Sequence, residues 1–159
     1  MDTMPTLCWV MHSCYKQQDS IFNPSSSSSY SNVSCGTSEC SQAASTIGRS
    51  LPCDGTTCTY STKYGDGSTS NGWFSKDTLT LTLTDKFPSF LFGCGQNTSD
   101  EFGTTARILG LGRDPVSIVS QTSQKYENYF SYCLPPTASS TGHLTLGKTR
   151  ASTGNLTFT

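Results

Sequence analysis

Two short stretches of the chain hold side chains that could act on or bind a substrate. The first is Asp2-Thr3, in the opening MDTMPTLCW, where a carboxylate stands next to a hydroxyl. The second is residues 63–68, in which Tyr64 precedes Gly65-Asp66-Gly67. The Asp-Gly pair predicts a tight hairpin turn with a positive φ angle. Such a bendable hairpin could be an ordinary surface turn, or it could fold the Tyr64 hydroxyl over a bound peptide.

Cysteines form the other reactive set. The chain has eight, and four of them make two pairs of equal spacing, Cys35/Cys40 and Cys53/Cys58. Four thiolates could bind zinc, but the strongest zinc patterns place two residues inside each pair, whereas four stand there in this chain. We therefore expect disulfides and no metal site. Spacing alone leaves three pairings open, of which we expect the nested one, Cys35–Cys58 and Cys40–Cys53.

Composition indicates an oxidising compartment and excludes some partners. Many cysteines in a chain with only 13% charged residues are typical of secreted proteins, and three sequons predict N-glycosylation at Asn32, Asn97 and Asn155. The net charge of -1 gives no basis for binding nucleic acid or an anionic membrane surface. No apolar run approaches the roughly 20 residues that span a bilayer, and no secretion signal begins the chain, which suggests a fragment of a secreted protein.

The spacing of apolar residues predicts a mainly β protein. Residues 78–84 (TLTLTLT) alternate perfectly, as in a strand with one buried and one solvent-exposed face. FLFG at 90–93 and LTLG at 144–147 are typical of strands closed by glycine, and ILGLG at 108–112 of a buried strand end. Many short strands with turn signals favour a sandwich or barrel over parallel βαβ units.

One short helix and one surface loop are also expected. Asp114 suits the N-cap and Pro115 the first position of a helix that runs to about Gln121. The five-serine run at 25–29 is expected to be a surface loop, because Ile21-Phe22 on one side and Tyr30 on the other could anchor it. A chain of 159 residues has room for one domain with a core.

Several longer motifs resemble a known family. Cys14-Tyr15, IFNPSSSSSYSNVSC, YGDGSTSNGWFSKDTLTL, FGCGQN, ILGLGRDPVSIVSQ, FSYCLP and TGHLTLG are similar to the N-terminal lobe of plant pepsin-like aspartic proteases of the nepenthesin type, and also to the N-terminal domain of plant xylanase inhibitors. The resemblance implies a single lobe of the pepsin-like fold at 14–147, with antiparallel sheets, one or two short helices and a disulfide-stapled insert at 35–58. Residues 1–13 would be a degraded catalytic-turn region, and 148–159 a tail toward a missing second lobe.

The same resemblance implies roles for individual residues. Tyr64 matches the flap tyrosine, with Gly65, Asp66 and Gly67 beside it at the substrate, and Trp9 matches the tryptophan that supports the flap. Asp2 and Thr3 match the catalytic Asp-Thr/Ser-Gly turn, although Met4 and Pro5 replace the glycine and serine expected next. Among the cysteines, the resemblance implies a Cys14–Cys94 disulfide and a bond from Cys133 to the C-terminal lobe.

Aspartic proteolysis needs two carboxylates that share one proton, and each lobe supplies one. The chain holds no second Asp-Thr/Ser-Gly. The resemblance therefore implies a hydrolase lineage, an aspartic endopeptidase of the secretory pathway or extracellular space that needs no cofactor, and we expect this lobe to be inactive alone. Its partners would be a peptide or protein substrate and the second lobe. The alternative is a non-catalytic protein that binds a glycosidase, as xylanase inhibitors do; a third option is a structural remnant.

Overall fold

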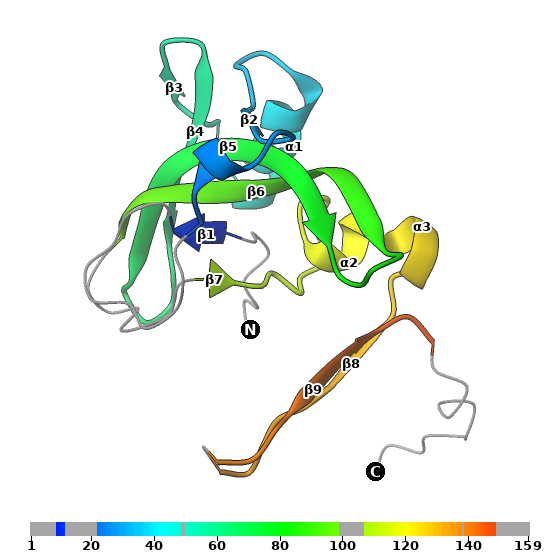
Figure 1. Cartoon of the computed structure of the whole chain (residues 1–159). Helices are drawn as coiled ribbons and strands as arrows, with labels where there is room; N and C mark the ends of the chain where they lie inside the picture. Colours follow the sequence, from blue (N-terminus) through cyan, green and yellow to red (C-terminus); the bar gives the residue numbers. More distant parts are fainter. Residues whose placement is uncertain (1–8, 12–21, 49, 99–106, 138, 149–159) are drawn as a thin grey trace. The chain divides into compact units, whose positions relative to one another are not determined.

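The structure is a computed structural model in which residues 9–11, 22–48, 50–98, 107–137 and 139–148 are described. Strands dominate these residues, so the mainly β class expected from the sequence is confirmed (Figure 1). The chain divides into two compact units, residues 1–121 and 122–159. None of the described helices has the length and apolar character that crossing a membrane requires.

The first unit is built on a seven-stranded sheet in the order β3-β4-β5-β6-β1-β7, with β2 also paired to β5. All its pairings are antiparallel except that of β1 with β6. The strands are β1 (Trp9–Met11), β2 (Ser31–Asn32), β3 (Cys53–Asp54), β4 (Thr57–Lys63), β5 (Thr69–Thr80), β6 (Lys86–Thr98) and β7 (Arg107–Ile108). The long, curved β5–β6 hairpin runs through the middle of this sheet (Figure 1).

The alternating segment at 78–84 is only partly a strand, so that expectation was wrong in its second half. β5 ends at Thr80, which pairs with Lys86 at the start of β6. The intervening residues close the hairpin, where the Leu81 N–H donates to the Asp85 carbonyl at 2.9 Å. The tip leaves Leu83 98% exposed. An alternating pattern does not show where a strand ends and its turn begins, because the register of pairing with the neighbouring strand sets the last paired residue.

A ten-residue helix, α1 (Ser38–Ile47), was missed from the sequence. Thr37 caps its start, since the hydroxyl accepts the Cys40 N–H, and Gly48 ends it in the left-handed conformation at φ 76°. Its buried residues are Cys40 and Ala43, which join the core cluster. That cluster consists of Val33, Cys40, Ala43, Cys58, Tyr60, Phe74, Leu91 and Val116.

The serine run forms the expected surface loop. It contains a short 3-10 helix, η1 (Pro24–Ser26), and its flanking aromatic residues anchor it. The ring of Phe22 lies 5.7 Å from that of Tyr30 and 5.8 Å from that of Phe92, centroid to centroid. The loop is also tied by side chains, because the hydroxyls of Ser27 and Ser29 both donate to Asp77, at 2.9 and 2.5 Å.

The expected helix after Asp114 is shorter than predicted. It is α2 (Ile118–Gln121), and Pro115 lies in the turn before it. Ser117 caps this helix in place of Asp114, since its hydroxyl accepts the Ser120 N–H at 3.2 Å. Ser117 therefore takes the N-cap role that the sequence assigned to Asp114.

The second unit holds α3 (Ser123–Tyr126) and a two-stranded antiparallel sheet of β8 (Phe130–Cys133) and β9 (His143–Leu146). Strand β9 covers the predicted LTLG strand, and Gly147 follows it with φ 87°. The Gly147 N–H donates to the Tyr129 carbonyl at 2.8 Å, which fixes the end of the hairpin.

Candidate functional site

The expected flap is a hairpin between β4 and β5. The strands pair up to Lys63 and Thr69, and the loop closes with two backbone bonds. The Tyr64 N–H donates to the Ser68 carbonyl at 2.9 Å, and the Gly67 N–H donates to the Tyr64 carbonyl at 3.1 Å. Gly67 takes the left-handed conformation with φ 93°. This is a turn followed by a glycine bulge, so the positive φ predicted for Asp-Gly is confirmed and belongs to Gly67.

Asp66 braces the flap through its side chain. Its Oδ1 accepts the Ser68 hydroxyl at 2.6 Å and the Ser68 N–H at 2.9 Å. Both hydrogen bonds favour the charged form, so the Ser68 hydroxyl and backbone N–H lower the pKa of the Asp66 carboxyl from its usual value. Because Ser68 is fully buried while Asp66 is exposed, the carboxylate ties the tip of the flap to an interior anchor.

The base of the flap carries a row of inward side chains on β4. Cys58 and Tyr60 are buried on the face that Thr62 shares, since side chains alternate along a strand. The Tyr60 hydroxyl lies 2.8 Å from the Ser70 hydroxyl in the interior. The Thr62 Oγ1 is buried without a hydrogen-bond partner in the described part of the chain. A buried unpaired hydroxyl costs about 1–3 kcal/mol, so this position is a weak point of the flap base.

Glycine 93 of β6 makes room for this row. A Cβ built on Gly93 would lie 2.6 Å from the Tyr60 Cε1 and 3.0 Å from its hydroxyl oxygen. Only glycine therefore lets β6 pass under the Tyr60 ring at this distance. The FLFG pattern predicted a glycine that closes a strand, whereas Gly93 lies inside β6 and serves close packing.

Strand β1 is the described segment nearest in sequence to the expected catalytic turn. Its residue Trp9 pairs with Gly93 of β6 on one side and with Ile108 of β7 on the other. The chain thus passes between two strands directly after the region that contains Asp2. Asp2, Thr3, Met4 and Pro5 lie outside the described residues, as do Cys14 and Asn155. The role of Asp2 and the contact of the Trp9 side chain with the flap stay predictions.

The four cysteines of the insert form two disulfides, but the predicted nested pairing was wrong. The bonds join Cys35 to Cys53 and Cys40 to Cys58, so the two loops cross. Cys53 and Cys58 face each other across the β3–β4 pair, with Cys53 exposed and Cys58 fully buried. Helix α1 turns Cys40 into the core beside Cys58 and leaves Cys35 before the helix, half-buried. The two buried cysteines, Cys40 and Cys58, therefore bond to each other, and the two more exposed cysteines, Cys35 and Cys53, form the other disulfide.

Two further cysteines are thiols in the structure. Cys94 of β6 is a free, buried thiol rather than half of the expected Cys14–Cys94 pair, and Cys14 lies outside the described residues. Burial raises the pKa of the Cys94 thiol, while hydrogen bonds with Tyr30 and Gln96 act in the opposite direction. Cys133, in β8, is exposed. Its bond to a second lobe remains a prediction.

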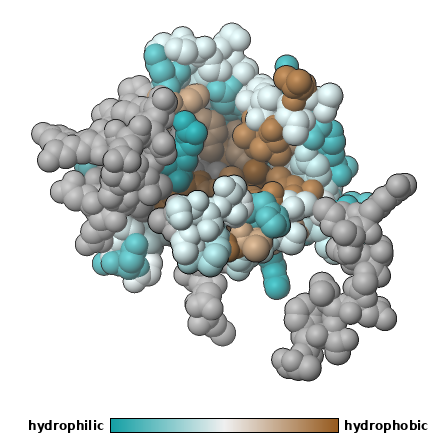
Figure 2. Space-filling model, turned by 60° about the horizontal axis from the view of Figure 1, so that its bottom comes forward, coloured by the Kyte–Doolittle hydropathy of each residue, from teal (hydrophilic) through white to brown (hydrophobic). Residues whose placement is uncertain are grey.

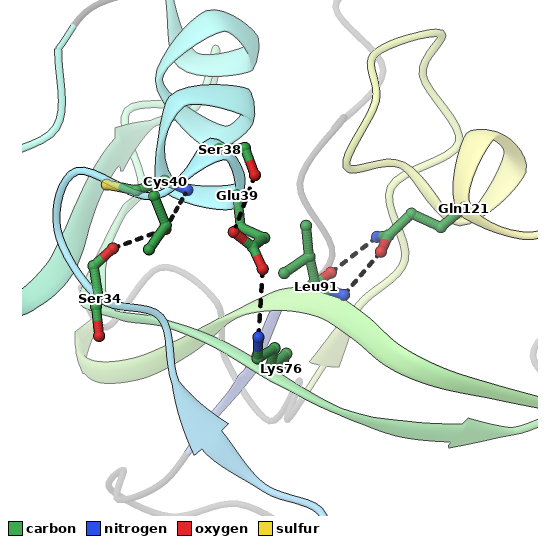
Figure 3. Close-up of polar contacts among 8 residues, drawn as sticks. Ser34, Ser38, Glu39, Cys40, Lys76, Leu91 and Gln121 are labelled. Carbon is green, nitrogen blue, oxygen red and sulfur yellow. Dashed lines mark hydrogen bonds and ion pairs between the residues drawn. The ribbon is translucent and has the colours of Figure 1, made fainter.

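Two polar contacts that the sequence did not reveal hold the sheet to its helices (Figure 3). Lys76 of β5 forms an ion pair with Glu39 of α1 at 3.3 Å. The Gln121 side chain accepts the Leu91 N–H at 2.7 Å and donates to the Leu91 carbonyl at 2.9 Å, as a neighbouring strand would. Its amide also donates to the Val116 carbonyl at 2.9 Å. No local pattern signals such a contact, because Gln121 and Leu91 are 30 residues apart.

The described residues offer no cluster of three or more His, Cys, Asp or Glu side chains that could hold a metal ion. On the face drawn in Figure 2, hydrophobic side chains gather between hydrophilic ones. Large apolar side chains are exposed in both units. They are Leu81, Leu83 and Leu109 in the first unit and Tyr129, Tyr132, Leu134 and Leu144 in the second.

Comparison with known proteins gives concordant matches over most of the chain. A family model described as "Xylanase inhibitor N-terminal" matches residues 1–148. An aspartyl protease family protein of Arabidopsis thaliana is 46% identical over 92% of the chain and 32% of its own length. Aspartyl protease AED1 of the same plant is 44% identical over 92% of the chain and 31% of its own length. Aspartic proteinase nepenthesin-1 of Nepenthes gracilis is 39% identical over 92% of the chain and 33% of its own length. The chain thus spans about a third of the length of these relatives.

Proposed function

Because this chain belongs to the xylanase inhibitor N-terminal family and is similar to plant aspartic proteases, we propose that it supplies the first lobe of an aspartic endopeptidase and is inactive alone. The observation that carries the proposal is the flap hairpin at residues 64–68, braced by Asp66 and Ser68, within a family match that covers both the hairpin and Asp2. The structure is consistent with a single pepsin-like lobe.

In the proposed reaction, Asp2 is one of two carboxylates that share a proton. One carboxylate takes a proton from water as the water attacks the peptide carbonyl, and the other protonates the carbonyl oxygen. Tyr64, on a hairpin hinged at Gly67, would cover the bound peptide and exclude water from the reacting bond. The second carboxylate would come from a second lobe, because the chain has one Asp-Thr at a matching position and no second Asp-Thr/Ser-Gly.

The β8–β9 hairpin is the proposed contact for that second lobe. Alternation and register put Phe130, Tyr132, Leu144 and Leu146 on one face of this two-stranded sheet. A two-stranded hairpin is marginally stable alone, so an apolar face of this kind favours a covering partner. Cys133 lies on the opposite face of the hairpin and is exposed, and its bond to the second lobe remains a prediction from the family resemblance.

A chimera tests the assignment of Asp2. The chain would replace the matching N-terminal third of nepenthesin-1, and cleavage of denatured globin would be followed at acid pH with and without pepstatin. We expect no pepstatin-sensitive cleavage by the chain alone. The chimera should gain activity when Met4→Gly and Pro5→Ser restore the turn, and lose it again with Asp2→Asn as the matched control. A restored chimera that keeps its activity after Asp2→Asn would refute the assignment, and cleavage by the chain alone would refute the claim that the lobe is inactive.

A second candidate function is that of a non-catalytic binder of a secreted glycosidase. It is favoured by the family description and by Met4 and Pro5, which stand where a functional aspartate turn has glycine and serine. A pull-down with a purified xylanase would measure this binding, with a Tyr64→Ala chain as a control for the flap face. Absence of binding to a panel of purified xylanases would remove this candidate.

We also propose that the protein passes through the secretory pathway. The support is the pair of disulfides in the insert, since cytosolic thiols are kept reduced. The test is the redox state of the four cysteines in the native source, measured after rapid alkylation. Alkylation of all four as thiols would contradict the proposal.

A further inference from the structure

The sequon Asn32-Val33-Ser34 lies on the surface of the first unit, in and directly after the short strand β2. Asn32 and Ser34 are exposed, whereas Val33 between them is 2% exposed and belongs to the core. The two sequon side chains that matter for glycosylation are therefore directed to solvent, while the middle residue holds the segment in place. Of the three sequons, this is the one that falls wholly within the described residues.

The hydrogen bonds of Asn32 use its amide oxygen. The Oδ1 accepts the Tyr30 hydroxyl at 2.7 Å and the Ser75 hydroxyl at 3.1 Å, and Ser75 is the residue directly opposite Asn32 on β5. The amide nitrogen makes no hydrogen bond in the described part of the chain. Oxygen and nitrogen diverge from the planar amide carbon, so an oxygen held toward Tyr30 and Ser75 directs the nitrogen away from both.

We propose that Asn32 carries an N-linked glycan attached at Nδ2, and that the folded protein retains its Tyr30–Asn32–Ser75 hydrogen bonds with the glycan in place. The donor is a lipid pyrophosphate-linked oligosaccharide. A bond forms between Nδ2 and C1 of the first sugar, and the bond from C1 to the pyrophosphate oxygen breaks. The lipid pyrophosphate leaves with the bonding electrons, and Nδ2 loses one of its two protons. The Oδ1 lone pairs take no part.

The position is also compatible with the proposed substrate site. Asn32 pairs with Ser75, and the flap begins beyond Thr69, six residues away along β5. At about 3.3 Å per residue the separation along the strand is about 20 Å. The attachment point at Asn32 therefore lies outside the hairpin at residues 64–68. The proposal depends on passage through the secretory pathway, as proposed above, and does not depend on proteolytic activity.

The test is expression of the chain behind a cleavable secretion signal in cultured mammalian cells. Secreted and cell-retained protein would both be digested with peptide N-glycosidase in heavy-oxygen water, which marks each released site for peptide mass spectrometry. We expect the mark on Asn32 and the loss of one glycan's mass. Ser34→Ala removes the sequon without touching the hydrogen bonds of Asn32, and it should abolish the mark, whereas Ser34→Thr keeps the sequon and should retain it.

The outcomes separate the site from its role in the fold. An unmarked Asn32 in both fractions would overturn the proposal, as would a mark that persists in Ser34→Ala. If Asn32 is marked but the glycosylated wild-type protein unfolds at lower urea than the unglycosylated Ser34→Ala protein, which keeps Asn32, the claim that the hydrogen bonds survive glycosylation is wrong. A chain that carries the mark and yet shows no activity in the chimera with Met4→Gly and Pro5→Ser would refute the protease proposal alone.

Discussion

The crossed disulfides lead to a prediction about which bond stabilises the protein more. Each closes a loop with a sequence separation of 18, so the loop-closure model assigns each about 3 kcal/mol of stabilisation. The difference lies in burial. Cys40 and Cys58 are 8% and 0% exposed, whereas Cys53 is exposed. Replacing two buried sulfurs by alanine loses about 1 kcal/mol more for each, since each sulfur is similar in size to a methylene.

We therefore expect Cys40→Ala with Cys58→Ala to cost about 5 kcal/mol, and Cys35→Ala with Cys53→Ala to cost about 3 kcal/mol. The measurement is urea unfolding of each oxidised double variant, with the free energy of unfolding taken from the midpoint and slope. The matched loop lengths make the second variant the control for the first. If both double variants lose the same free energy of unfolding, or if the Cys35–Cys53 variant loses more, the assignment of Cys40 and Cys58 to the core would be refuted.

Peptide mapping tests the pairing directly. Trypsin and a glutamyl endopeptidase that also cleaves after Asp would separate the four cysteines into peptides 20–39, 40–49, 50–54 and 55–63. Without reduction, the crossed pairing links 20–39 to 50–54 and 40–49 to 55–63. The nested pairing would link 20–39 to 55–63 instead, and finding that peptide would show the structure of the insert to be wrong.

Three further results are expected. Gly93→Ala should lower the free energy of unfolding by about 1–3 kcal/mol, because its Cβ would lie 2.6 Å from the buried Tyr60 ring; an unchanged urea midpoint would contradict this packing. Gly67→Ala should cost about 1–2 kcal/mol because φ is 93°, whereas Gly65→Ala, with nothing within 4 Å of its Cβ, should leave the midpoint unchanged. Burial raises the pKa of Tyr30 to about 12, so an absorbance titration should show this tyrosine ionising near that pH. Because tyrosine in the unfolded chain ionises near pH 10, the free energy of unfolding should fall between about pH 10 and 12. The Tyr30→Phe variant should not show that fall.

Local chemistry explains why the hairpin turn at residues 64–68 could be predicted from the sequence. The turn requires a positive φ at the residue after Gly65-Asp66, and the sequence places a glycine there. The β-like residues on both sides of the turn then favour a hairpin. The anchoring of the serine run was predictable for a similar reason, since Phe22 and Tyr30 flank it closely in sequence. Both features depend on residues within a few positions of each other.

Helix α1 carried local signals that were overlooked. Thr37 suits an N-cap, Ala43 and Ala44 favour a helix, and Gly48 suits its left-handed end. The end of β5 at Thr80 had no such signal. TLTLTLT continues the strand pattern past the turn, and only pairing with Lys86 sets the boundary.

The sequence by itself determined the mainly β class, the hairpin turn at Gly67 and the family, because turn residues, alternation and long motifs can be read along the chain. The tertiary structure decided which cysteines bond, why Gly93 must be glycine and where Gln121 binds. The physical reason is that these features depend on which side of an element faces the core. Spacing allows Cys40 to reach either Cys53 or Cys58, and only the packing of α1 on the sheet turns it toward Cys58.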